Sequence, residues 1–169
     1  MGKEELVAFG RIAKTIDYAI TEKGYKKGKP ALGLRQSEWD GMALHPKTTI
    51  GGILQRAASL GAVTGKYDEI LMYLFDDIDS ASDYGTLKNP ISLEDQGVVM
   101  VAYYQFDPNL MDSDEAAKRL DVSKQRLYKL LQDGKLHGLK VNGKWKVCKK
   151  SLDVRVKIKN GNPDSTDTA

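Results

Sequence analysis

Residues 110–156, LMDSDEAAKRLDVSKQRLYKLLQDGKLHGLKVNGKWKVCKKSLDVRV, contain the pattern that decides the fold of this chain. Asp112 or Ser113 can cap a short helix that carries two small alanines and a leucine on one face. After a tight turn, Ser123 caps a second helix, which ends at Gly134 in a left-handed cap. Two helices joined by three or four residues, the first with small residues that allow close packing, predict a helix-turn-helix.

A β-hairpin is predicted directly after the two helices, and no strand is expected before residue 136. Apolar and polar residues alternate on both sides of Asn142-Gly143, the strongest short signal for a type I′ turn. Ser151 is expected to cap a last short helix. The apolar side chains of the hairpin are expected to face the helices and its lysines to face outward: Leu139, Val141, Trp145 and Val147 inward, and Lys140, Lys144 and Lys146 outward.

In order and spacing, this region resembles the winged helix-turn-helix of the excisionase and MerR-like family. The resemblance covers about 45 residues and is carried by Glu115-Ala116-Ala117, Leu120, Val122-Ser123, Leu127-Tyr128, Leu131, Gly134-Lys135-Leu136, Gly143, Trp145 and Leu152. The region departs from the family at Cys148-Lys149-Lys150, where the family often has Ile or Val and Pro. The resemblance implies that the second helix enters the major groove of duplex DNA and that the wing contacts the DNA backbone or minor groove.

The resemblance also implies which side chains face the DNA. Ser123 starts the recognition helix, and Gln125 and Arg126 are predicted to contact base edges. The phosphates are predicted to be contacted by Lys124, Lys129, Lys144 and Lys146, and Lys140 is a further predicted DNA-binding residue.

Positive charge is concentrated in the same region. Residues 111–159 hold fourteen Lys and Arg against six Asp and Glu, whereas residues 1–106 hold twelve against fourteen. Lysines on a helix often form only a solvated face, and helix-turn-helix units also mediate protein contacts. A surplus of this size on one small unit nevertheless favours phosphate binding.

The whole chain is predicted to be mainly α: a helical bundle over residues 1–106 for partner docking or dimerisation, a winged helix-turn-helix over 110–159 and a disordered tail over 160–169. The apolar content of 41% supports a real core, and Cys148 is the only cysteine, which excludes an internal disulfide. No signal peptide or membrane-spanning run is apparent, so the expected location is the cytoplasm.

The bundle is predicted from four or five amphipathic segments. The first helix is expected over residues 4–22, and the next two are expected to begin at Ser37 and at Thr48 or Thr49. Gly51-Gly52 is interpreted as room for a close neighbour, and residues 107–109 as a short linker. Residues 23–30 form a basic, glycine-rich loop that could hold a phosphate backbone while Tyr25 stacks on a base, or could simply be solvated.

Residues 6–106 also resemble the C-terminal helical region of the large subunit of type I-C CRISPR surveillance complexes, which is made separately as the small subunit. The resemblance is carried by Gly10-Arg11, Pro46, Gln96-Gly97 and Tyr103-Tyr104, and it departs at Val99, Ala102 and Phe106-Asp107. It implies nucleic-acid or partner contacts at Arg11, Lys14, Lys23, Tyr25, Lys26, Lys27, Lys29 and Arg56. The acidic balance of the bundle favours docking on protein, as in a phage-encoded mimic of that subunit.

Nothing in the sequence predicts catalysis, a cofactor or a metal site. His45 and His137 lie far apart and without a ligand pattern, and no phosphate-cradling loop or nucleophile elbow is present. The sequence therefore predicts a cytoplasmic, non-enzymatic regulator that binds double-stranded DNA and whose bundle docks on a protein or dimerises. The alternative is a CRISPR effector small-subunit-like protein, or a mimic of it encoded by a phage or mobile element that inhibits a type I CRISPR complex, as an anti-CRISPR protein does, and regulates its own operon.

Overall fold

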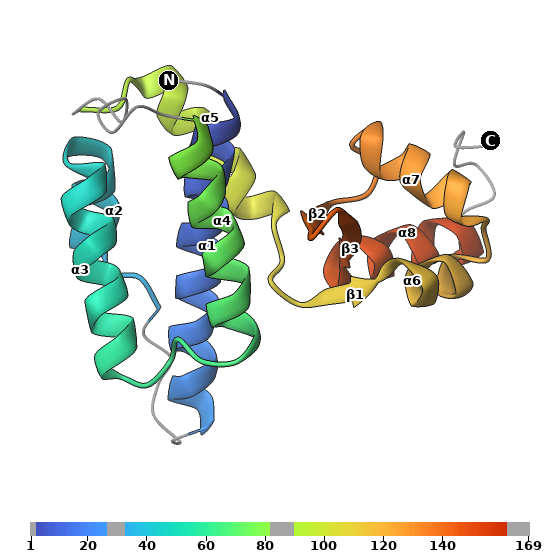
Figure 1. Cartoon of the computed structure of the whole chain (residues 1–169), viewed down its shortest axis with the longest axis horizontal. Coiled ribbons are helices and arrows are strands. Elements are labelled where there is room, and N and C mark those ends of the chain that lie inside the picture. Colours follow the sequence, from blue (N-terminus) through green and yellow to red (C-terminus); the bar gives the residue numbers. More distant parts are fainter. Residues whose placement is uncertain (1–2, 27–32, 82–89, 162–169) are drawn as a thin grey trace. The chain divides into compact units, whose positions relative to one another are not determined.

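A computed structural model describes residues 3–26, 33–81 and 90–161 (Figure 1). The chain divides into two compact units, residues 1–104 and residues 105–169. The first unit is helical, and the second combines three helices with a small antiparallel sheet. The predicted fold class, mainly α with an N-terminal group of helices followed by a winged helix-turn-helix, is confirmed.

The first unit is built around its longest helix. Within the described residues, five helices form it: α1 (Lys3–Lys26), α2 (Gln36–Leu44), α3 (Pro46–Ser59), α4 (Lys66–Ala81) and α5 (Leu93–Gln105). Helix α1 packs along α4, and α2 packs against α3 (Figure 1). The inner side of α1 carries apolar residues at three- and four-residue spacing, among them Phe9, Ile12 and Ile16, all at most 1% exposed.

Three expected helix boundaries are wrong in this unit. Helix α1 continues to Lys26, so the first residues of the predicted loop are helical, and residues 27–32 lie outside the described part. Helix α2 begins at Gln36, one residue before the predicted cap Ser37. Helix α3 begins at Pro46 rather than at Thr48 or Thr49, because proline suits the first helical position, where no backbone donor is needed.

The interpretation of Gly51-Gly52 is also wrong. Both glycines are exposed, and a Cβ atom at either would meet nothing within 4 Å. The close approach occurs at Gly10 of α1, where a Cβ would lie 2.3 Å from the carbonyl oxygen of Val99 in α5. Gly10 therefore lets α1 and α5 pack backbone against backbone.

The second unit contains a three-stranded antiparallel sheet with strand order β1-β3-β2. Its elements are β1 (Leu110–Asp112), α6 (Ser113–Leu120), α7 (Lys124–Gln132), β2 (Gly138–Val141), β3 (Lys144–Cys148) and α8 (Lys149–Gly161). Strand β1 lies before residue 136, so that expectation is wrong. A strand of three residues is too short to show the alternation from which strands are predicted.

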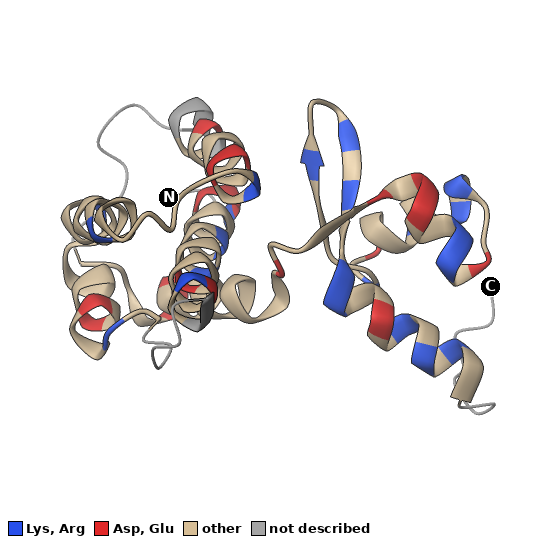
Figure 2. Cartoon of the chain, turned by 90° about the horizontal axis from the view of Figure 1, so that it is seen from below, with Lys and Arg blue, Asp and Glu red and all other residues tan. Residues whose placement is uncertain are grey.

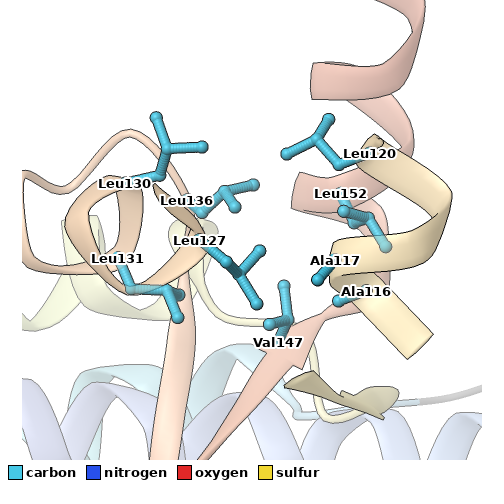
Figure 3. Packing of buried hydrophobic residues seen from close by; sticks show 9 residues of the cluster. All are labelled: Ala116, Ala117, Leu120, Leu127, Leu130, Leu131, Leu136, Val147 and Leu152. Carbon is cyan, nitrogen blue, oxygen red and sulfur yellow. The ribbon is translucent and has the colours of Figure 1, made fainter. Parts of the chain in front are cut away.

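The core of the second unit lies between α7 on one side and α6 and α8 on the other (Figure 3). Its buried side chains come from both helices of the pair, the segment after α7, the sheet and α8: Ala116, Ala117, Leu120, Leu127, Leu130, Leu131, Leu136, Val147 and Leu152. The small Ala116 and Ala117 bring α6 close to the leucines of α7. This core fixes the angle at which α7 presents its outer face.

Helix α8 differs from the predicted short helix in its start and length. It begins at Lys149, so Ser151 does not cap it, and the Ser151 hydroxyl instead accepts a hydrogen bond from the backbone N–H of His137 at 3.0 Å. It extends to Gly161, which includes the first two residues of the predicted tail, and residues 162–169 lie outside the described part. Across the described residues, no helix has the length and apolar character needed to cross a membrane.

Candidate nucleic-acid interface

The turn between α6 and α7 is held by backbone hydrogen bonds and by a distant lysine. Asp121 adopts a left-handed conformation with φ of 54°, and the N–H of Val122 donates to the carbonyl of Ala117 at 3.1 Å. The ammonium of Lys159, in the last turn of α8, donates to the carbonyl oxygen of Leu120 at 2.7 Å. These bonds satisfy carbonyls that the end of α6 would otherwise leave unpaired.

Both ends of α7 follow the prediction. The Ser123 hydroxyl accepts a hydrogen bond from the backbone N–H of Arg126 at 3.1 Å, which makes it the N-cap. At the other end Gly134 has φ of 72°, and the N–H of Lys135 donates to the carbonyl of Leu130 at 2.9 Å. Ser123 therefore fixes which residues occupy the first turn of the helix.

The two faces of α7 are chemically opposite. Leu127, Leu130 and Leu131 are at most 6% exposed and point into the core (Figure 3). The outer face carries the polar residues predicted to meet DNA, with Lys124, Gln125 and Lys129 exposed and Arg126 half-buried. Among the described residues, no ion pair engages Arg126. The arrangement presents a cationic, hydrogen-bonding surface in the first turn and middle of the helix.

The hairpin has the predicted turn but not the predicted faces. Asn142 and Gly143 have φ of 52° and 73°, so the type I′ prediction is confirmed. This two-residue turn pairs Val141 with Lys144 across the strands. Because cross-strand partners share a face, Leu139 and Val141 lie on the face of Lys144 and Lys146, whereas Trp145 and Val147 lie on the other. The expectation that all four apolar residues share a face is therefore wrong.

The predicted wing lysines are divided between the two faces of the hairpin. Lys144 and Lys146 share one face, whereas the Lys140 ammonium lies 5.4 Å from the ring centre of Trp145 on the other. Lys140 and Lys144 are exposed, and Lys146 is half-buried. Figure 2 shows positive charge on both strands of the hairpin.

Three of the predicted phosphate-binding lysines are bonded to carboxylates of the same unit. Lys124 Nζ lies 2.5 Å from Asp114 Oδ1, Lys129 Nζ lies 3.3 Å from Asp133 Oδ1, and Lys146 bonds to Asp112. The bond from Lys146 lowers the pKa of the Asp112 carboxyl, and the bond to Asp114 raises the pKa of Lys124. The Asp112 carboxylate and the Lys124 ammonium therefore stay charged near neutral pH. Each of the three carboxylates occupies a place that a phosphate could take.

Several residues that position this surface carry no recognisable sequence signal. Residues 107–109 were expected to be a linker, but the Asp107 carboxylate is buried and accepts hydrogen bonds from the backbone N–H groups of Asn109 and Lys150, both at 3.0 Å. Asp107 thus caps the start of α8. Gly138 allows β2 to approach β3, since a Cβ there would lie 2.4 Å from the Lys146 carbonyl oxygen. The residues around Gly138 alternate between apolar and polar like those of any short strand. The need for glycine at this position is therefore visible only in the three-dimensional contact.

The residues of the first unit that were predicted to contact nucleic acid have different surroundings. Arg56 is bonded to Glu38, with Nε 2.7 Å from Oε1, and the Lys14 ammonium lies 4.5 Å from the ring centre of Tyr103. Burial raises the pKa of Glu38, but the hydrogen bonds from Arg56 and the Arg35 backbone outweigh it, and the net shift is downward. Arg11 and Lys23 are half-buried in α1. Lys27, Lys29 and the side chains of Tyr25 and Lys26 lie outside the described part.

Neither histidine lies in a recognisable metal site. In residues 3–26, 33–81 and 90–161, no group of three or more His, Cys, Asp or Glu is arranged to hold a metal ion. His45 ends α2 and precedes Pro46, and His137 connects the end of α7 to β2. The functional prediction therefore depends on the surface of α7 and the wing.

Comparison with known proteins identifies the same region. Residues 110–156 match the family model of a helix-turn-helix domain. Such a domain suggests DNA binding and is typically non-enzymatic. No curated protein and no solved structure matches the chain. The likeness of residues 6–106 to a CRISPR complex subunit, and the excisionase-like character of the winged unit, stay predictions.

Proposed function

We propose that this protein binds duplex DNA through the outer face of α7 and the wing, as a non-enzymatic regulator of the excisionase and MerR type. The helices of residues 1–106 supply a protein contact, either docking or dimerisation. One observation carries the proposal: the Ser123 cap and the leucine core turn Lys124, Gln125 and Arg126 outward in the first turn of a helix that is followed by a basic hairpin.

Position along α7 separates the expected roles of its side chains. In helix-turn-helix proteins the N-terminal residues of the second helix contact base edges. Gln125 and Arg126 lie there, and both side chains can form paired hydrogen bonds, glutamine to adenine and arginine to guanine. The lysines carry point charges that suit phosphate oxygens, which position the protein without reading sequence.

The ion pairs on this surface are compatible with DNA binding. An exposed pair contributes only about 0–1 kcal/mol, because water and salt screen it. A phosphate contact by the same lysine also releases condensed counterions from the DNA. Exchange of Asp114, Asp133 or Asp112 for a phosphate therefore costs little and leaves the protein fold unchanged.

The test compares Arg126→Ala with Lys144→Ala in the full chain. A binding sequence is first selected from a random duplex library, and affinity is then measured on that sequence and on random DNA across a salt series. Arg126→Ala should cost about 1–3 kcal/mol on the selected sequence and much less on random DNA. Lys144→Ala should weaken both alike and lower the salt slope by about 1.

A matched control is Lys47→Ala, which removes an exposed lysine from α3. Its affinity should equal that of the unchanged protein on both DNAs. Equal losses for Arg126→Ala and Lys144→Ala on both DNAs would show that α7 does not read bases. Failure of the unchanged chain to bind duplex DNA at low salt would reject the proposed function.

A further inference from the structure

The outer face of α5 is an exposed apolar stripe. Leu93, Val101 and Tyr104 are 85%, 54% and 69% exposed, and with Gly97 between them they follow one side of the helix. Single exposed apolar side chains are ordinary on protein surfaces. A contiguous stripe of them along one helix marks an interaction surface.

The opposite face of α5 is fixed in the core, so the helix cannot turn to bury the stripe. Val99, Ala102 and Tyr103 are at most 8% exposed, and Gly10 of α1 approaches the α5 backbone directly. The Tyr103 hydroxyl donates a hydrogen bond to Asp17 of α1 at 2.5 Å. Burial, with this hydrogen bond, raises the pKa of Tyr103, so the hydroxyl keeps its proton. A helix that is apolar on all sides is normally covered on all sides.

The distribution of charge on α5 disfavours nucleic acid and favours a self-complementary partner. No charged residue occurs from position 96 to position 105, so the stripe offers nothing to a phosphate. The first turn of α5 carries Glu94 and Asp95. Two copies of this helix in antiparallel orientation keep the two acidic starts apart, at opposite ends of the pair. A parallel pair would instead bring like charges together.

The shape of the surface is also self-complementary. A Cβ at Gly97 would meet nothing within 4 Å, so a second helix can approach closely at the middle of the stripe. An apolar pocket with about 60 Å³ of free space opens beside α5, between α1 and α2, and Met100 and Trp39 line it. Leu93 protrudes from the same helix. The surface thus carries both a projecting apolar side chain and a hollow that can receive one.

We propose that the outer face of α5 binds a second copy of this chain, with the two α5 helices antiparallel and crossing at Gly97. A standard interface buries ~800 Å² on each partner, and three exposed side chains on one helix cover less than that. The dimer is therefore expected to be weak. This inference deepens the proposed function, because it names the partner of the bundle and supplies two winged units to read two half-sites in DNA.

Cysteine cross-linking tests the orientation directly. Cys148 is the only cysteine and is buried, so the full chain with Cys148→Ser provides a background without thiols. In this background Gly97→Cys should form an intermolecular disulfide, because the two positions 97 meet at the crossing within disulfide reach. Tyr104→Cys should not, because the two positions 104 lie about 20 Å apart in an antiparallel pair.

Each cross-linking outcome decides the proposal. Disulfide formation by Gly97→Cys and not by Tyr104→Cys supports the antiparallel dimer. Equal cross-linking of both variants indicates parallel pairing and overturns it. Absence of cross-linking in both, with a monomeric mass at hundreds of micromolar protein, overturns it as well, whether the stripe binds another protein or none.

Sedimentation equilibrium of Leu93→Lys provides a second measurement. Leu93 is almost fully exposed in the single chain, so the substitution leaves the fold intact and should raise the dimer Kd about tenfold or more. Met72→Lys is the matched control, because Met72 is 65% exposed on α4 and lies outside the stripe, and it should leave the Kd unchanged. Equal effects of both variants would contradict the proposal. All of these measurements are made without DNA, so their failure is distinguishable from a failure of DNA binding.

Discussion

The outer faces of α5 and α7 are both exposed, but they offer different chemistry to a partner. Helix α7 presents lysines, a glutamine and an arginine over a leucine core, whereas α5 presents Leu93, Val101 and Tyr104 over a core of its own. Water and salt can satisfy the first face and cannot satisfy the second. Exposure alone therefore does not identify a function, whereas the chemistry of the exposed side chains indicates the kind of partner that each face can bind.

The largest effect is expected from a substitution in the core beneath α7, which should affect the second unit and leave α5 unchanged. Leu127→Ala removes a fully buried side chain from the core beneath α7 and should lower the free energy of unfolding of the second unit by about 2–5 kcal/mol. DNA binding should be lost near the melting temperature of this variant, while cross-linking through Gly97→Cys is retained. Thermal denaturation followed by circular dichroism measures the first effect. Loss of both activities together would show that the units do not fold independently.

The second substitution changes the contact between α1 and α5 in the first unit. Gly10→Ala places a Cβ 2.3 Å from the Val99 carbonyl oxygen, so the two helices must separate, at a cost of about 1–3 kcal/mol. Gly51→Ala is the matched control, because that helical position is open and alanine there should stabilise α3 by about 0.4–1 kcal/mol. Chemical denaturation of both variants measures the difference. Stabilisation by Gly10→Ala would contradict the close α1–α5 contact.

A smaller effect is expected at Asp107, which links the start of α8 to the rest of the second unit. Asp107→Ala removes the acceptor for the Lys150 backbone N–H and should cost about 0.5–2 kcal/mol, as loss of a helix cap does. Asp107→Asn retains one oxygen acceptor and should cost less. The melting temperatures of the two variants measure which of them loses more stability. An unchanged melting temperature for Asp107→Ala would show that Asp107 serves only as part of a linker.

The smallest effect is expected from the ion pair between Asp114 and Lys124 on the cationic face of α7. Asp114→Asn removes the carboxylate bonded to Lys124 but keeps the size of the side chain. The lysine then meets DNA without losing a partner, and affinity for random duplex DNA should rise by a few-fold, the range of an exposed ion pair. Fluorescence anisotropy at low salt measures this, with Asp40→Asn on α2 as a control for the change in net charge. Equal gains for both variants would assign the effect to net charge alone.

Local signals predicted the caps and the turn of the winged unit, and long-range contacts explain several of the failures. Ser123, Gly134 and Asn142-Gly143 act within a few residues of themselves, and each has the predicted role. The face of Leu139 was predicted from alternation, although the two-residue turn already pairs it with Lys146. Asp107 has its main partner 43 residues away, so no local pattern reveals it. The same limit applies to the α5 stripe, because the burial of Val99 and the exposure of Val101 depend on where α1 lies.

The bond from Lys159 to the turn between the two recognition-unit helices has a practical consequence for dissecting the protein. The family match ends at residue 156, but the ammonium that satisfies the Leu120 and Asp121 carbonyls comes from three residues further along. A fragment trimmed to the matched length would leave these two carbonyls of the α6–α7 turn without the lysine ammonium. The smallest autonomous piece of this region therefore extends past the boundary that sequence similarity assigns to it.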